Sequence, residues 1–214
     1  METIFVSLVS FVNLLNIIMK EKILYNATEM FLNIGFKSIT MDDIASNAGI
    51  SKKTIYAHFS NKIELVEAVT LNMFDVIKKG VAIIHAQEQN PIIELFEIKR
   101  FVMEHLKDEK SSPQYQLQKY YPKIYKTLKQ KQFTVMQELI KENLGKGIQQ
   151  KLFRDTIDID FIARIYFNGM VGIKNKDLFP LQNNSMNSLT TNHLEYHLRG
   201  ISTEKGIKQL EKQL

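Results

Sequence analysis

Cysteine is absent from this chain of 214 residues. Its absence excludes disulfide bonds, thiolate zinc sites and cysteine nucleophiles, and it fits a reducing compartment. Glycine and proline are scarce, with 9 and 4 residues, so long stretches are free to form helices. The apolar fraction of 44% and the charged fraction of 24% are ordinary for a globular protein that buries a core. We therefore expect a cytoplasmic globular protein.

A long uninterrupted apolar run is also missing. The nearest is residues 1–19, METIFVSLVSFVNLLNIIM, which is short for a membrane span and is broken by polar residues such as Asn13 and Asn16. No basic residue precedes the apolar part and no small-residue cleavage site follows it, so it does not fit a secretory signal. Three interpretations of this hydrophobic extension stay open: a mis-assigned start with Met19 as the first residue, an additional helix packed on the body or on a partner subunit, and a membrane tether.

Apolar residues recur at spacings of three and four along most of the chain, and neither strand-like alternation nor an internal repeat is found. The fold class is therefore predicted to be all-α. Helices are expected at residues 20–33, 41–47, 51–59, 61–79, 91–107, 113–120, 122–144, 158–173 and 189–198, followed by a frayed helical tail from residue 203. Polar loops are expected at residues 108–112 and 175–187, and Gly145 and Gly147 are expected at the end of the helix that begins at Pro122.

Residues 40–59, TMDDIASNAGISKKTIYAHF, have the features of a helix-turn-helix. Thr40 is a good N-cap for the first short helix, with Asp43 three residues later. Gly49 can adopt the positive φ that the turn requires, and Ser51 caps the second helix. The fourth helix is expected to begin with a capping box between Asn61 and Glu64.

The face of the second short helix that points away from its apolar seam is basic. Residues 51–62 contain three lysines and no acid, although residues 20–72 as a whole carry six basic and six acidic side chains. Side chains of this kind suit base edges and phosphates of a DNA groove, and the free N–H groups of the helices that begin near Thr40 and Lys62 suit phosphates. The alternative is a helical corner in an unrelated protein whose lysines are merely solvated.

The stretch from Lys20 to about Val69 resembles the DNA-binding domain of the TetR family of bacterial regulators. The matching pieces are KEKILYNATEMFLNIGF, SITMDDIASNAGISKKTIYAHF and SNKIEL. The resemblance implies a three-helix helix-turn-helix domain at residues 20–69, joined by a long helix to an all-helical effector-binding and dimerisation domain at residues 70–214. It implies phosphate contacts from Thr40, Tyr56 and Lys62. The expected DNA-binding set is Thr40, Ser51, Lys52, Lys53, Thr54, Tyr56, His58 and Lys62.

The resemblance also implies a homodimeric regulator, usually a repressor, of double-stranded DNA. The apolar helices at 158–173 and 189–198 are expected to pair with their mates in a four-helix interface, since both need cover. A two-fold dimer requires a roughly palindromic operator. A small-molecule effector would lower operator affinity by a population shift.

Aromatic residues are frequent in the second half of the chain and are most simply core. Some are expected to line a cavity between helices, where small ligands bind helical proteins. The candidate ligand-binding residues are Phe101, Tyr121, Tyr125, Phe133, Tyr166, Phe167 and Met170.

Other chemistry has weaker support. His193 and His197 lie one helical turn apart and could hold a metal, but a third ligand is missing and a surface or subunit-interface role is preferred. The cluster of Asp155, Asp158 and Asp160 is better explained by helix capping, with Asp158 as the N-cap, than by calcium. No catalytic arrangement is apparent, so we expect no enzyme, no metal and no cofactor. The rival hypothesis is a membrane-associated helical protein-interaction module without DNA binding, supported by the hydrophobic extension.

Overall fold

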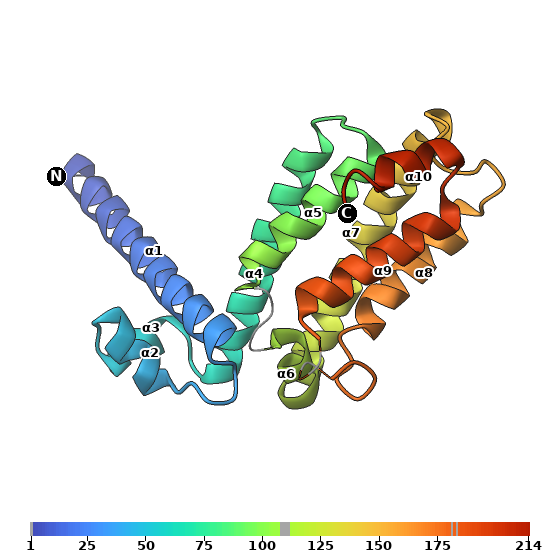
Figure 1. Cartoon of the computed structure of the whole chain (residues 1–214). Coiled ribbons are helices and arrows are strands. Elements are labelled where there is room, and N and C mark those ends of the chain that lie inside the picture. Colours follow the sequence, from blue (N-terminus) through green and yellow to red (C-terminus); the bar gives the residue numbers. More distant parts are fainter. Residues whose placement is uncertain (1, 108–111, 181, 183) are drawn as a thin grey trace.

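The computed structural model describes residues 2–107, 112–180, 182 and 184–214, and for residues 2–10 the helical backbone only (Figure 1). Ten α-helices and no strand occur in this part of the chain, where the only β-type pairing is an isolated bridge between Phe153 and Ser202. The predicted all-α fold class is confirmed. Of the polar loop expected at 108–112, only Ser112 lies within the described residues.

The N-terminal unit consists of α1 (Glu2–Asn33), α2 (Met41–Ala48) and α3 (Lys52–His58). Helix α1 begins at Glu2 rather than at residue 20, so the hydrophobic extension continues the first helix instead of forming a separate one. Its side chains from residue 11 to residue 18 are exposed, including Phe11 and Ile17. Residues 11–18 therefore do not pack on the body of the same chain, and packing on a partner subunit stays a prediction. Among the described residues no helix is both long and apolar enough to cross a membrane.

A chain that starts at Met19 is expected to be as stable as the full chain, within about 0.5 kcal/mol in the free energy of unfolding. Met19 packs against the core of the N-terminal unit, whereas residues 11–18 are exposed on a helix that projects beyond the other elements (Figure 1). Urea denaturation of the two chains measures the difference. A loss above about 1 kcal/mol would show that the extension makes stabilising contacts. The shorter chain should also aggregate less, because exposed apolar surface is removed.

Helix α4 (Lys62–His85) leads from the N-terminal unit into the body and is longer than the predicted 61–79. The body contains α5 (Pro91–His105), α6 (Pro113–Tyr120), α7 (Pro122–Gln149), α8 (Ile159–Gly172), α9 (Met186–Ile201) and α10 (Glu204–Leu210). Figure 1 shows α4 and α5 packed beside α7 and α8 on its other side, while α9 packs on α8 and α5. The described part of the chain thus forms a helical body with the N-terminal unit attached at one end.

Helix α7 does not end at Leu144, as predicted, but runs through both glycines to Gln149. At Gly147 the ring of Phe153 lies so close that a Cβ atom would collide with it. This glycine is therefore explained by close packing inside a helix. The chain turns instead just beyond Gln150, where Lys151 adopts a φ of +58°.

The C-terminal tail was expected to fray, and this expectation is wrong. The Thr203 hydroxyl accepts a hydrogen bond from the Gly206 N–H at 3.2 Å and caps α10. Leu210 at the end of this helix is fully buried in the core of the body. Helix α9 likewise extends beyond the predicted 189–198 at both ends, so the loop expected at 175–187 ends at Ser185, which caps α9.

The core of the N-terminal unit continues into the body. Ile23, Phe31 and Ile55 belong to one buried cluster with Leu117 of α6 and Leu128 of α7. A second cluster lies among α5, α7, α8, α9 and α10. Because α6 and α7 help to bury the N-terminal helices, a displacement of α6 and α7 would also displace α1 to α3.

Candidate nucleic-acid interface

The turn between α2 and α3 has the geometry that the sequence predicts. Gly49 is in the left-handed region, with φ 62° and ψ 39°. The Gly49 and Ile50 N–H groups donate to the carbonyls of Ser46 and Ala45 at 3.2 and 3.0 Å. These two bonds close the end of α2 and set the direction in which α3 leaves.

Thr40 caps α2 through the expected reciprocal pair with Asp43. The Asp43 N–H donates to the Thr40 hydroxyl oxygen at 3.2 Å, while the Asp43 carboxylate accepts from the Thr40 N–H at 2.8 Å and from its hydroxyl at 2.7 Å. These bonds hold the pKa of Asp43 below its usual value. Thr40 is thereby fixed at the exposed start of α2.

Helix α3 buries one face and exposes the other. Ile55 is 0% and Phe59 1% exposed, whereas Tyr56 is 43% exposed and Lys53 is also on the surface. Ser51 caps the helix by accepting from the Thr54 N–H at 3.0 Å, and the two hydroxyls lie 2.8 Å apart. The caps and the buried seam therefore orient a short helix whose free face carries donors and small side chains.

Lys52 forms an ion pair that its place in the sequence does not indicate. Its ammonium donates to the Asp42 carboxylate at 2.7 Å, which raises the Lys52 pKa. Both side chains are exposed, so water and a phosphate can compete for this ion pair. Sequence reasoning missed the pair because the two residues lie on different helices and only the turn geometry brings them together.

Asn61 caps α4 as predicted, by accepting from the Glu64 N–H at 3.0 Å. The Glu64 carboxylate, however, accepts from the N–H and hydroxyl of Ser60, so the expected capping box with Asn61 is wrong in its second half. The Lys62 ammonium lies 3.4 Å from the Lys37 carbonyl oxygen. Partial burial lowers the Lys62 pKa, while the nearby Asp43 carboxylate acts in the opposite direction.

Lys37 joins the N-terminal unit to the body, a role that the sequence did not reveal. Its N–H donates to the Gln116 side-chain oxygen at 3.1 Å, and its ammonium lies 5.3 Å from the centre of the Tyr120 ring. Gln116 also lies against Gly35, whose φ is 106°. No local pattern predicts these contacts, because 79 positions separate Lys37 from Gln116.

Residues 23–69 match the family described as bacterial regulatory proteins, tetR family. The matched segment runs from α1 into α4 and includes the complete α2–turn–α3 unit. This segment of the chain is therefore similar to the corresponding part of bacterial regulators of that family.

Two curated relatives of the chain differ in the direction of regulation. It is 42% identical over 62 residues to the HTH-type transcriptional activator FasR of Mycolicibacterium smegmatis, which is 29% of this chain and 28% of FasR. It is 37% identical over 57 residues to the icaADBC negative transcriptional regulator IcaR of Staphylococcus epidermidis, which is 27% of this chain and 31% of IcaR. The similarity therefore spans less than a third of either relative's length.

Solved structures resemble the chain over most of its length. SmeT, the repressor of a Stenotrophomonas maltophilia multidrug efflux pump, aligns with a TM-score of 0.64 at 17% identity, over 86% of this chain and 91% of SmeT. A TetR-family regulator from Agrobacterium tumefaciens aligns with a TM-score of 0.66 at 16% identity, over 88% of this chain and 100% of that one. These likenesses show that the fold is shared.

A cavity of about 230 Å³ lies between α1 and the helices of the body. Of the seven candidate ligand residues, Tyr166, Phe167 and Met170 line it. The other four lie elsewhere: Phe101 packs on Gly80 and His105, Tyr121 and Tyr125 pack on the core of the N-terminal unit, and Phe133 packs on Phe167. Ligand contact by any of the seven stays a prediction.

The histidine pair of α9 lies against α8 and not on an open surface. The His193 and His197 rings are 6.3 Å apart, and both lie against the Tyr166 ring. Burial lowers the pKa of His197 to about 4, with His193 adding to the effect. Among the described residues no cluster of three or more metal-ligating side chains is found.

Asp158 caps α8 by accepting from the Phe161 N–H at 3.1 Å, which confirms its predicted capping role.

Proposed function

We propose that the protein is a homodimeric regulator of transcription that binds double-stranded DNA through α3 in a sequence-specific manner and acts in the cytoplasm. The observation that carries this proposal is the exposed face of α3, held outward by the buried Ile55 and Phe59. Lys53, Thr54, Tyr56 and His58 lie on or beside that face and would reach base edges. Thr40 and Lys62, at the starts of α2 and α4, would flank it with phosphate contacts.

The proposed dimer interface is formed by α8 and α9. Both helices leave apolar side chains in solvent, namely Phe161, Ile165 and Tyr196. Pairing of these helices with their mates would cover such side chains in a four-helix arrangement. Two recognition helices related by a two-fold axis would require a roughly palindromic operator.

The cavity supports modulation by a small ligand. Its walls include Phe31 and Leu32 of α1 together with Leu117 of α6, and Phe31 and Leu117 also belong to the core that supports the helix-turn-helix. A ligand that fits better when these walls are separated would favour an arrangement in which α1 is displaced relative to the body. Because α3 is held by the same core, operator affinity would fall by a population shift. The proposed regulator is thus a repressor that its effector releases from DNA.

Sequencing of the fragments that the protein retains from a pool of random duplexes tests the proposal. The wild type is expected to enrich a roughly palindromic site. A variant carrying Lys53→Ala and Thr54→Ala is expected to enrich a different or relaxed site, since each lost base contact removes about 1–3 kcal/mol of discrimination. Lys79→Ala, which removes an exposed lysine of α4 far from α3, is the control and should retain the wild-type site. The same site with all three proteins, or no enrichment by the wild type, would contradict the proposal.

A further inference from the structure

The cavity in the body combines apolar walls with positive charge. Its lining is mainly aliphatic, methionine and phenylalanine side chains, and no described lining residue is an aspartate or a glutamate. Three lining residues are lysines, from three different helices or their ends: Lys78, Lys99 and Lys174. A space of this kind is unsuited to water alone and favours a ligand with an apolar part and a negative charge.

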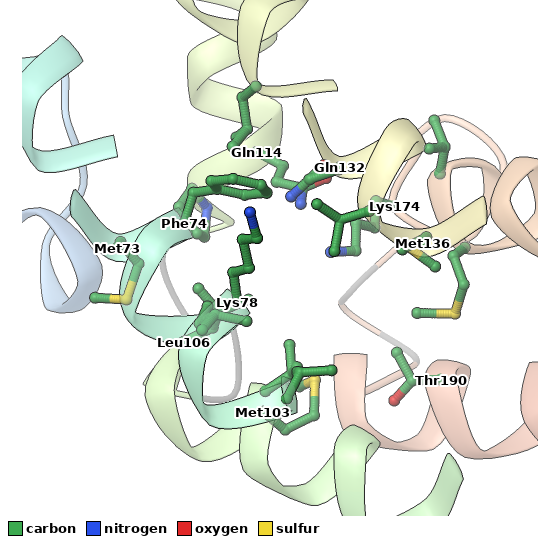
Figure 2. A pocket seen from close by; sticks show the side chains of 18 of the residues that line it. Met73, Phe74, Lys78, Met103, Leu106, Gln114, Gln132, Met136, Lys174 and Thr190 are labelled. Carbon is green, nitrogen blue, oxygen red and sulfur yellow. The ribbon is translucent and has the colours of Figure 1, made fainter. Parts of the chain in front are cut away.

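The three lysines are placed differently. The Lys99 ammonium donates to the Thr191 hydroxyl at 2.7 Å, so it is tied to α9. Figure 2 shows the amines of Lys78 and Lys174 pointing into the cavity, on the side where Gln114 and Gln132 also lie. Met103 and Thr190 lie on the other side of the same view. The cavity therefore has a polar, positively charged side and an apolar remainder.

We propose that this cavity binds a straight-chain aliphatic carboxylate, with its head between Lys78 and Lys174 and its chain along the apolar walls. The proposal deepens the function proposed above by naming the chemical class of its effector, and it rests on that function only for the regulatory consequence. Each methylene of the chain gains from transfer out of water, and the carboxylate gains charge-assisted hydrogen bonds from the two ammonium groups.

The charge and the shape of the cavity select among ligand classes. A carboxylate is attracted by the ammonium groups of the exposed Lys78 and the half-buried Lys174, whereas an alkylammonium ion is repelled and an alcohol gains neither effect. The volume of about 230 Å³ is below the roughly 300–1,000 Å³ of sites for drug-sized ligands, which favours a slender chain over a fused ring system. Met73, Met103, Met136 and Met170 line the cavity and can adapt to a flexible chain.

Calorimetric titration of the full chain, without DNA, tests the ligand class. Straight-chain carboxylates from hexanoate to hexadecanoate should bind about three- to fourfold more tightly with each added methylene until the cavity is filled, after which affinity should level off. Dodecanol and dodecylammonium should each bind at least about tenfold more weakly than dodecanoate, because neither accepts hydrogen bonds as an anion. Equal affinity for dodecanoate and dodecanol would overturn the proposal.

Variants at the two lysines test the placement of the head. Lys78→Gln with Lys174→Gln should lower the affinity for dodecanoate by about tenfold or more and leave that for dodecanol unchanged. Lys79→Gln, on the neighbouring exposed lysine that does not line the cavity, is the matched control. Lys78→Glu with Lys174→Glu should reverse the preference toward dodecylammonium, a result that mere loss of structure cannot produce. Unchanged dodecanoate binding by both double variants would overturn the proposal.

DNA binding separates this inference from the proposed function. If dodecanoate binds as expected but no DNA is retained, the proposed function fails and the ligand site stands. If DNA is retained but no carboxylate binds, the ligand site fails and the regulator stands. If both hold, dodecanoate should lower DNA affinity by the same factor by which operator DNA lowers dodecanoate affinity, as linkage requires.

Discussion

Replacing Tyr56 by phenylalanine and Lys62 by glutamine is expected to weaken binding to DNA of every sequence by about tenfold or more for each change. The two residues would contact phosphates, which are the same at every site, so sequence preference should be unaffected. Tyr56 is exposed on α3 and Lys62 at the start of α4 is only partly buried, so neither change removes a side chain of the core. Fluorescence anisotropy with specific and random duplexes measures the affinities.

The salt dependence distinguishes the two changes. Lys62→Gln removes one charge that displaces a counterion, so the slope of log affinity against log salt should fall by about 0.9. Tyr56→Phe removes a neutral donor and should lower affinity with almost no change in slope. Lys79→Gln again serves as the control with a wild-type slope. If Lys62→Gln leaves both affinity and slope as they are, Lys62 does not contact DNA and the proposed placement of α4 on the backbone is wrong.

Replacing His85 by alanine is expected to lower the free energy of unfolding by about 3 kcal/mol, which is typical of removing one partner from a buried ion pair. His85 Nδ1 lies 3.0 Å from the carboxylate of Glu94, which is 1% exposed. Asn143 also donates to this carboxylate at 3.2 Å, so α4, α5 and α7 meet at one buried acid. Urea denaturation of wild type and variant below about pH 6 measures the loss.

The matched control for this prediction is Glu142→Gln. Glu142 lies 2.8 Å from the other ring nitrogen of His85, but its side chain is 61% exposed, so its ion pair is worth little. The control should lose less than about 1 kcal/mol. Similar losses for the two variants would mean that burial of Glu94 does not make the His85 contact strong.

The stabilisation by His85 should depend on pH. Its pKa is raised above the usual value of 6.5, chiefly by the hydrogen bond to Glu94 and further by Glu142, while burial and the nearby Lys146 act in the opposite direction. Because the pKa of His85 is higher in the folded protein than in the unfolded chain, the extra stability is fully present at pH values below the unfolded-state pKa. It is lost as the pH rises through the folded-state pKa. The difference between wild type and His85→Ala should therefore shrink from about pH 6 upward past the raised pKa.

Features that depend on near neighbours in the chain were predictable. Thr40 with Asp43, Gly49 in the turn, Ser51 and Asp158 all act within a few residues, and the structure has each as predicted. The recurrence of apolar residues at spacings of three and four also placed the helices and the buried seam of α3. Such features are decided by local hydrogen bonding and periodicity, which the order of residues contains directly.

Other features were not predictable because their partners lie far along the chain. Gly147 is explained by the ring of Phe153 that packs against it and not by a helix end, and the exposed candidate Lys52 forms an ion pair with Asp42 of another helix. Some aromatic residues were expected to line the cavity, yet four of the seven candidate residues lie outside it. An aromatic side chain on a helix can pack against any neighbour, and only the crossing of the helices decides which one it meets.

By itself the sequence determined an all-helical chain with a capped helix-turn-helix whose outward face is basic, because capping, turn geometry and periodicity act over a few residues. Only the tertiary structure decided that the core of the N-terminal unit includes residues of α6 and α7. It also decided that two lysines from distant elements face one largely apolar cavity. These arrangements follow from how whole helices pack, and packing joins residues that no short stretch of the chain contains.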